Sequence, residues 1–215
     1  MALGELNALP KYDLTLLGIF QSYKFFIGYE DLLRKEFTFT GHILEQVFAY
    51  YKNVTPPYWH QESFVRVGIH VRRTDLITER GQRNGYIAAS ADYFVHAMEY
   101  FKTKYNKVQF IVASDDLDWC KENIKDQHII YYNHDSIMDL AILSFSNHII
   151  TSIGTYSWWV GWLCRGTTIY YNISPPVILV IFTPTTVGYH HHMISIITGY
   201  LSNKVIFIIW HLLRF

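Results

Sequence analysis

Short apolar runs alternate along this chain with longer segments in which apolar residues recur every three or four positions. Short runs bounded by turn residues are typical of buried strands, and the wider spacing is typical of amphipathic helices. The clearest helix pattern is Asp92–Tyr105, with Phe94, Ala97, Met98 and Phe101 as the expected buried stripe. The full pattern predicts helices at Glu30–Lys35, His42–Tyr51, Asp92–Tyr105, Asp116–Ile124, Ile137–Phe145 and Ser157–Cys164, and strands at Phe64–Ile69, Val108–Ala113, Ile129–Tyr132, His148–Thr151 and Thr168–Tyr171.

From Phe64 onward the expected elements alternate between strand and helix. This order is typical of an α/β protein with a doubly wound parallel sheet and right-handed crossovers. The prolines of Thr55-Pro56-Pro57 separate this region from the helices before it. The length of 215 residues suits one domain, or one domain and part of another.

The segment 177–215 differs in composition from the rest of the chain. Val177–Phe182 and Val205–Leu213 are strongly apolar, yet both are shorter than the roughly 20 residues that a membrane-spanning helix needs. We expect buried strands here. The alternative is a spanning helix over Met193–Leu213, which would place Ser202, Asn203 and Lys204 near the middle of the membrane.

Composition excludes several classes of function. The 18 basic and 18 acidic side chains give a net charge of zero, which argues against a general nucleic-acid binder. Cys120 and Cys164 are too few for a disulfide framework, and buried thiols are favoured over a bridge. The run His190–His192 lacks a metal-ligand spacing, so no metal site is expected there. Met1–Leu6 has neither the basic nor the apolar segment of a signal peptide, and no anchor is expected.

The segment from Phe64 to Asp75, FVRVGIHVRRTD, carries the most informative chemistry. Its apolar half predicts a buried strand, which ends in His70, the adjacent Arg72 and Arg73, and Asp75. Ligands of open α/β sheets bind beyond the carboxyl ends of the strands. Guanidinium groups offer rigid donor forks and permanent positive charge, which suit a diphosphate. The cluster therefore predicts a site for an anionic, nucleotide-linked substrate.

Two other strand ends carry polar residues. Ser114-Asp115-Asp116 follows one strand and either lines a ligand cleft or caps the next helix. Ser152–Ser157 contains a glycine and hydroxyls and opens a tryptophan-rich helix. Free N–H groups and the helix dipole favour an anion at such a helix start. The second segment is thus expected to contact the same diphosphate as the arginines.

Three motifs together resemble a known family. VGIHVRRTD, FIVASDDLDWCKENI and MDLAILSFSNHIITSIGTYSWWVGWL are similar, in order and spacing, to the alpha-1,2-fucosyltransferases of glycosyltransferase family 11, and most so to its divergent nematode members. The earlier GIFQSYKFF, Gly18–Phe26, resembles the segment before that family's catalytic half. The resemblance extends from about Gly18 to Pro176.

The resemblance implies a GT-B-like enzyme that is inverting, needs no metal ion and uses GDP-fucose as donor. It implies a remnant of the N-terminal, acceptor-side domain over 1–60, a Rossmann-like donor domain over 61–176 and an atypical apolar tail over 177–215. It also implies a Golgi membrane protein with a lumenal catalytic domain, held by a family-type anchor that is absent here. The acceptor would be a galactose-terminated glycan, and no nucleic acid is expected to bind.

The resemblance also assigns site residues. Arg72 and Arg73 would bind the diphosphate and stabilise the departing GDP, with Arg72 the leading candidate. His70 would face the guanine or ribose unless it is a core histidine, and Asp139 would read the guanine unless it caps a helix or is solvated. The remaining donor contacts implied are Ser114, Asp115, Gly154, Thr155 and Ser157.

The implied reaction is attack of a galactose 2-hydroxyl on the anomeric carbon of fucose. Asp75 and Glu79 are the candidate general bases, although Asp75 could instead hold Arg73 in place. Two alternatives remain open. One is a non-catalytic relative that binds GDP-sugar or glycan, and the other is a fucosyltransferase with a different acceptor. Asn53 and Asn172 begin N-glycosylation sequons, each followed by proline, which fit a secretory setting.

Overall fold

The computed structural model describes residues 27–59, 63–171, 180–184 and 191–195. The chain divides into two compact units. One comprises Met1–Thr38 with Tyr200–Phe215, and the other comprises Phe39–Gly199. Among the described residues of the first unit, α1 spans Glu30–Glu36 and confirms the helix expected there. The second unit contains the sheet and every predicted site residue.

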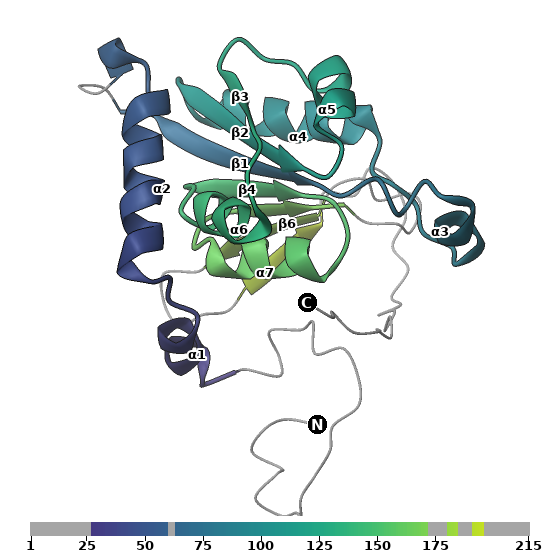
Figure 1. Ribbon diagram of the computed structural model, residues 1–215, viewed down its shortest axis with the longest axis horizontal. Coiled ribbons are helices and arrows are strands. Elements are labelled where there is room, and N and C mark those ends of the chain that lie inside the picture. The colour runs from purple at the N-terminus through teal and green to yellow at the C-terminus, as the bar shows by residue number, and fades with distance from the viewer. Residues whose placement is uncertain (1–26, 60–62, 172–179, 185–190, 196–215) are drawn as a thin grey trace, which may run out of the picture. The chain divides into compact units, whose positions relative to one another are not determined.

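A seven-stranded sheet lies at the centre of the second unit (Figure 1). Its strands stand in the order β3-β2-β1-β4-β5-β6-β7. The first five strands in this order are parallel, whereas β6 and β7 pair antiparallel. The strands are β1 (Val65–Val71), β2 (Val108–Ser114), β3 (Ile129–Tyr132), β4 (His148–Thr151), β5 (Thr168–Tyr170), β6 (Val180–Pro184) and β7 (His191–Ser195). The predicted α/β class and doubly wound parallel sheet are confirmed.

Helices cover both faces of this sheet (Figure 1). One face packs against α4 (Ala91–Lys104) and α5 (Leu117–Asn123). The other face packs against α2 (Gly41–Val54), α6 (Ser136–Ser144) and α7 (Thr155–Leu163). The sequence between these elements also contains α3 (Glu79–Arg83) and the 3-10 turn η3 at Pro57–Trp59.

The core on the α4 face follows from the periodicity of the sequence. The predicted stripe Phe94, Ala97, Met98 and Phe101 is buried, and Tyr93 is buried beside it. Full burial of such side chains contributes about 1.5–3 kcal/mol each. The hydroxyl of Tyr93 donates to the carbonyl of Thr151, 2.7 Å away, so the polar end of this side chain is satisfied inside the core.

The core on the opposite face depends on a residue without a side chain. Gly68 lies in the middle of β1, and a Cβ there would collide with Ile149 and Leu143. The glycine therefore lets α6, which carries Leu143, approach the strand closely. The second helix of the chain, α2, packs on the same face, with Val47 and Tyr51 in a cluster that includes Ile142.

Strands occur in part of the predicted apolar tail. The strand expected at Val177–Phe182 is present as β6, although its described residues are 180–184. The strand β7 was not predicted from the sequence. The strand expected at Val205–Leu213 lies outside the described residues. Among the residues the structure describes, no helix is both long and apolar enough to cross a membrane.

Candidate functional site

The carboxyl ends of β1 and β4 meet where the sheet changes its winding direction. The two strands are parallel neighbours, with His70 opposite Thr151, and the N–H of Ser152 donates to the carbonyl of His70 at 3.0 Å. The chain leaves β1 toward α4 on one face and leaves β4 toward α7 on the other. Such a reversal opens a crevice in which ligands of doubly wound sheets bind.

Arg72 lies at the switch point of the sheet, which is the place between β1 and β4 where the winding direction changes. Hydrogen bonds hold both its backbone and its side chain. Its backbone N–H donates to Oγ of Ser152 at 2.8 Å. Its Nε and Nη2 donate to the two carboxylate oxygens of Asp75, at 3.0 Å and 2.5 Å. These hydrogen bonds raise the pKa of the guanidinium and lower the pKa of the Asp75 carboxyl. Arg72 is therefore a fixed, permanently charged group.

The start of α7 faces this arginine. The N-cap of α7 is Gly154, whose φ of +111° is rarely adopted by residues with a side chain. A Cβ at Gly154 would collide with Nη1 of Arg72, so the guanidinium lies directly against the turn. The expected helix start at Ser157 was two residues late, because Gly154 already turns the backbone into the helix.

No side chain caps the first turn of α7, which distinguishes it from four other helices around the sheet. The side chains of Thr78, Ser90, Asp116 and Asp135 accept hydrogen bonds at the starts of α3, α4, α5 and α6. The hydroxyl of Thr155 is buried and has no hydrogen-bond partner among the described residues. Uncapped N–H groups beside an arginine make this helix start suitable for an anion.

His70 connects β1 to α7. Its Nδ1 lies 2.7 Å from Oγ of Ser157, and its ring packs against the ring of Tyr156 at 4.7 Å. Burial, and to a lesser degree the charge of Arg72, lower its pKa to about 3, so the ring is neutral at physiological pH. The predicted donor contacts His70, Gly154, Thr155 and Ser157 are thus brought together with Arg72.

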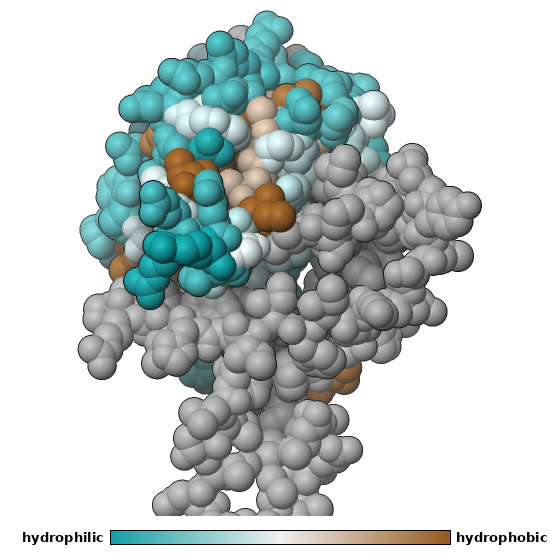
Figure 2. Space-filling model, turned by 90° about the vertical axis from the view of Figure 1, so that its right-hand side faces the viewer, coloured by the Kyte–Doolittle hydropathy of each residue, from teal (hydrophilic) through white to brown (hydrophobic). Residues whose placement is uncertain are grey.

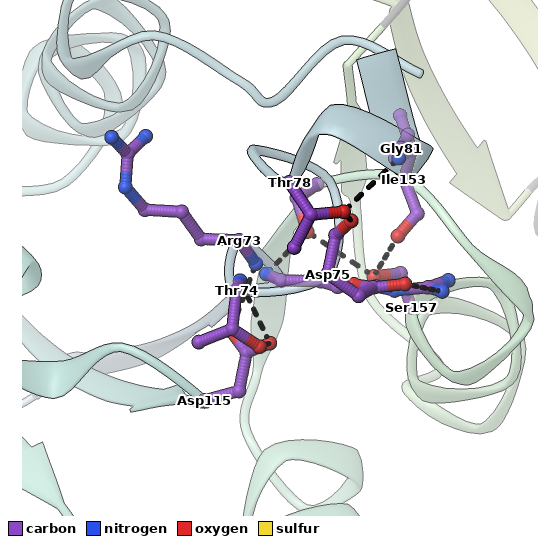
Figure 3. Close-up of polar contacts among 10 residues, drawn as sticks. Arg73, Thr74, Asp75, Thr78, Gly81, Asp115, Ile153 and Ser157 are labelled. Carbon is purple, nitrogen blue, oxygen red and sulfur yellow. Dashed lines mark hydrogen bonds and ion pairs between the residues drawn. The ribbon is translucent and has the colours of Figure 1, made fainter. Parts of the chain in front are cut away.

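Arg73 is directed elsewhere. Its Nε lies 3.3 Å from Oδ2 of Asp116, and its guanidinium packs over the ring of Trp119 at 4.2 Å. In Figure 3 its side chain extends away from Asp75 and Ser157. The suggestion that Asp75 holds Arg73 is therefore wrong, because Asp75 pairs with Arg72 and Asp116 pairs with Arg73.

The polar residues after β2 mainly organise the loops around them. Oγ of Ser114 accepts from the N–H of Asp116 at 2.9 Å, and Asp116 caps α5, as the capping alternative predicted. Asp115 accepts from the N–H groups of Arg73 and Thr74 and from the hydroxyl of Thr74 (Figure 3). An open hollow of about 370 Å³ lies beside these residues, at the ends of β2 and β3.

Asp139 lies in the first turn of α6, but it does not cap this helix. The cap is Asp135, which accepts from the N–H groups of Ile137 and Met138. Asp139 is half-buried, and its Oδ1 is buried without a hydrogen-bond partner among the described side chains. Burial, followed by the charge of Asp135, raises its pKa to about 7. The capping and solvated-surface alternatives for Asp139 are therefore both wrong.

The two candidate bases differ in their surroundings. Both oxygens of Asp75 are engaged by Arg72, and its lowered pKa makes it a weak proton acceptor. Glu79 is the first residue of α3, is exposed, and forms a 4.0 Å ion pair with Arg83. The engagement of Asp75 by Arg72 therefore weakens the case for Asp75 as the general base.

Sequence reasoning missed several residues that organise the site. They are Trp119, Thr78 and Gly81, while Ser152 and Tyr156 lie in the predicted segment Ser152–Ser157 but were given no individual role. The run Thr78-Glu79-Arg80-Gly81 has a capping residue before a glutamate, a signal that could have revealed α3. The contact of Trp119 with Arg73 depends on the placement of α5, which no local pattern encodes.

Other predicted features lie outside the site. Cys120 and Cys164 are buried free thiols, as favoured. Within the part of the chain that the structure describes, no group of three potential metal ligands occurs. Asn53 is exposed on α2, whereas Asn172 lies outside the described residues. The face shown in Figure 2 is mainly hydrophilic over its described part, with separate small apolar patches.

The sequence matches the family model described as Glycosyl transferase family 11 over residues 4–176. The match ends at Pro176, as predicted, and begins before Gly18. The chain is 30% identical over 180 residues to Galactoside alpha-(1,2)-fucosyltransferase 1 of Homo sapiens and 29% identical to the protein of that name from Aotus azarae. Each alignment covers 80% of this chain and 49% of the relative, so the chain spans about half the length of the curated relatives it matches.

Among solved structures, the chain is similar to NodZ alpha-1,6-fucosyltransferase soaked with GDP-fucose. The TM-score is 0.44 at 14% identity, over 68% of this chain and 49% of that one. The same enzyme co-crystallized with GDP gives a TM-score of 0.45 at 14% identity, over 67% and 48%. The family model matches most of the sequence and includes the whole of the site around Arg72. The chain belongs to glycosyl transferase family 11.

Proposed function

We propose that this chain binds GDP-fucose at the switch point and transfers fucose to the 2-hydroxyl of a galactoside, with inversion and without a metal ion. The observation that carries the proposal is the contact between Arg72 and the uncapped start of α7 at Gly154. The relatives named galactoside alpha-(1,2)-fucosyltransferase support the reaction and the acceptor.

The diphosphate of the donor would lie between Arg72 and the first turn of α7. A helix start carries about half a positive charge, and its free N–H groups donate to phosphate oxygens. The hydroxyl of Thr155, which lacks a partner among the described residues, would donate as well. Without a metal ion, these groups are the ones that would stabilise the charge of departing GDP.

In the proposed reaction, the bond between the anomeric carbon and the β-phosphate oxygen breaks, and its electron pair goes to the phosphate. The 2-hydroxyl oxygen of galactose bonds to the anomeric carbon from the opposite side. The hydroxyl proton passes to a carboxylate, for which Glu79 is the better candidate because Asp75 is engaged by Arg72.

The guanine would be selected by Asp139. A carboxylate accepts from the N1 and N2 hydrogens of guanine together, whereas adenine presents no such pair. The buried Oδ1 of Asp139 has no partner in the described part of the chain, so it is an acceptor without a donor. Burial, and then the charge of the neighbouring Asp139 carboxyl, raise the pKa of the phenols of Tyr132 and Tyr156.

A second candidate function is binding of a GDP-sugar without transfer. The observation that favours it is that Asp75, the carboxylate beside Arg72, is engaged by that guanidinium and has a lowered pKa, so it is a weak proton acceptor. The two functions share the donor site and differ in turnover. Release of fucose onto a galactoside, with the linkage determined by analysis of the product, distinguishes transfer to the 2-hydroxyl from transfer elsewhere.

The test of the donor site is calorimetric titration of the purified chain with GDP, with EDTA present throughout. We expect GDP to bind, ADP to bind much more weakly, and Arg72→Ala to weaken GDP binding about a hundredfold. The matched control is Arg165→Ala, which removes the same charge beyond the other end of α7, where Arg165 is exposed. A folded wild-type chain that ignores GDP would refute the proposal.

The proposed setting is the secretory pathway, with the catalytic part in the Golgi lumen. The support is the family and the exposed sequon residue Asn53. Imaging of the expressed chain, with and without digestion of N-linked glycan, tests this proposal. A chain that stays in the cytosol contradicts it.

A further inference from the structure

The ion pair between Asp75 and Arg72 points to a role for the carboxylate other than proton transfer. We infer that Asp75 is a positioning residue, which holds the guanidinium of Arg72 in the orientation that directs Nη1 at the start of α7. The inference rests on the proposed donor site, because the oriented group is the one that would meet the diphosphate.

The geometry of the pair fixes more than a distance. Asp75 occupies one edge of the guanidinium, since its oxygens accept from Nε and Nη2 at 3.0 Å and 2.5 Å. Two parallel hydrogen bonds prevent rotation of this planar group, which a single contact would allow. The third nitrogen, Nη1, then lies against Gly154, where a Cβ would collide with it.

Asp75 is itself held by the turn that leads into α3. Its carbonyl accepts from the hydroxyl of Thr78 at 2.8 Å, and Thr78 in turn caps α3 by accepting from the N–H of Gly81 at 3.0 Å (Figure 3). A Cβ at Gly81 would collide with the carbonyl of Asp75, so glycine permits this close approach. The neighbouring Leu76 is only 1% exposed and anchors the turn in the core. The backbone that carries the Asp75 carboxylate is therefore held in place beside Arg72.

A carboxylate beside an anion site also has an unfavourable effect, because it repels the ligand. The side chains of Arg72 and Asp75 are 32% and 52% exposed, so water screens this repulsion. Added salt screens it further, whereas salt does not restore a lost orientation. The dependence of GDP affinity on salt therefore separates positioning from repulsion.

The experiment measures GDP affinity by calorimetry for wild type and Asp75→Asn, at about 50 mM and about 500 mM salt. Because Asn cannot accept at both Nε and Nη2, we expect Asp75→Asn to bind GDP about tenfold more weakly at both salt concentrations. The matched control is Asp116→Asn, which breaks the other arginine–aspartate pair and keeps a residue that caps helices well. This control should bind GDP like wild type.

The same comparison in an Arg72→Lys background tests whether Asp75 acts through Arg72. Lysine keeps the positive charge but cannot form the paired contact, so Asp75→Asn should cost nothing further there. A further tenfold loss in that background overturns the inference. Tighter GDP binding by Asp75→Asn at low salt overturns it as well, because repulsion would then be the dominant effect.

A measurement without nucleotide keeps this inference distinct from the donor-site proposal. The hydrogen bonds with Arg72 lower the pKa of the Asp75 carboxyl, and carbon NMR titration of the free chain reads this shift. The pKa should return to its ordinary value in Arg72→Ala, and an unchanged pKa overturns the pairing. If the pKa of Asp75 is lowered as expected but the chain binds no GDP, the donor site is refuted, and the positioning role with it. The ion pair itself would still be supported.

Discussion

Arg72 and Arg73 are adjacent in the sequence, yet their side chains contact helices on opposite faces of the sheet. Arg72 lies against Gly154 at the start of α7 and pairs with Asp75. Arg73 lies over Trp119 of α5 and pairs with Asp116. The two residues follow the end of β1, and their contacts continue the alternation of that strand, in which successive side chains point to opposite faces. One arginine is thus available to a ligand, and the other joins the sheet to a helix.

This comparison bears on the prediction that both arginines bind one diphosphate, because Arg72 lies against the start of α7 and Arg73 lies over Trp119. In β1 the buried Val67, Ile69 and Val71 pack on the α4 and α5 side. Arg73 continues that series, whereas His70 and Arg72 belong to the α7 side. We therefore propose that the α7 side binds the ligand and that the α5 side contributes to stability. The following predictions test this division.

The largest effect is expected for Gly154→Ala. Alanine is strained at a φ of +111°, and its Cβ would displace Nη1 of Arg72, so GDP binding should weaken about a hundredfold. The matched control is Gly85→Ala, because Gly85 has a φ of +76° but no neighbouring atom within 4 Å of the added Cβ. Both variants should lose about 1 kcal/mol of stability from backbone strain. Calorimetry and thermal unfolding measure the two quantities, and equal losses of GDP affinity would contradict the division.

Arg73→Ala should act on stability. It removes the ion pair with Asp116 and the contact with Trp119, which together should cost about 1–2 kcal/mol. GDP affinity should fall less than threefold, since the guanidinium points away from the site. Denaturant unfolding followed by tryptophan fluorescence measures the loss. A hundredfold loss of GDP affinity with unchanged stability would place Arg73 in the donor site after all.

Asp139 should make the affinity for GDP depend on pH. Its pKa of about 7 means that the acceptor form predominates only above neutrality, so GDP affinity should rise as the pH increases from 6 to 8. Asp139→Asn should remove that part of the dependence, while the titration of the GDP phosphate remains common to both proteins. An unchanged pH profile in the variant would exclude Asp139 from guanine recognition.

The carboxyl of Asp139 should make the stability of the fold fall as the pH rises, whereas the affinity for GDP should rise. Its pKa is raised from the ordinary 3.8 in the folded chain, so its contribution is present below pH 4 and is lost as the pH rises through 7. After allowance for partial solvent screening, Asp139→Asn should therefore be about 1 kcal/mol more stable than wild type at pH 8 and indistinguishable from it near pH 4. Thermal unfolding at the two pH values tests this sign.

The smallest effect is expected for Thr74→Ala. The hydroxyl of Thr74 donates to Asp115 on the α5 side, at an exposed position. Its loss should cost less than about 1 kcal/mol of stability and leave GDP affinity unchanged. Urea unfolding and GDP titration of the variant measure both quantities. A clear loss of affinity would show that the α5 side also contributes to the donor site.

The sequence predicted the sheet and its helices well because burial repeats with a regular period. The strands at Ile129–Tyr132 and His148–Thr151 agree with the structure to the residue. The helix α3 was missed because only Gly81 is buried in its five residues, so it has no apolar stripe. Helix starts depend on single turn residues such as Gly154, which apolar periodicity does not report.

The candidate site was predicted in part. Local motifs identified His70, Arg72 and Gly154 because each occurs where a strand ends. They did not indicate which carboxylate pairs with which arginine. The pairing depends on where the turn before α3 and the start of α5 lie relative to the end of β1, and these positions are set by tertiary structure.

The position of α2 has a consequence for anyone who trims this protein for expression. All the motifs of the proposed nucleotide site lie after residue 63, so the motifs alone would suggest a fragment that begins at residue 61. Such a chain would lack Val47 and Tyr51, which cover Met138 and Ile142 on α6. The bared apolar strip would favour self-association over folding. The smallest soluble fragment is therefore expected to begin near Phe39, where the compact unit itself begins.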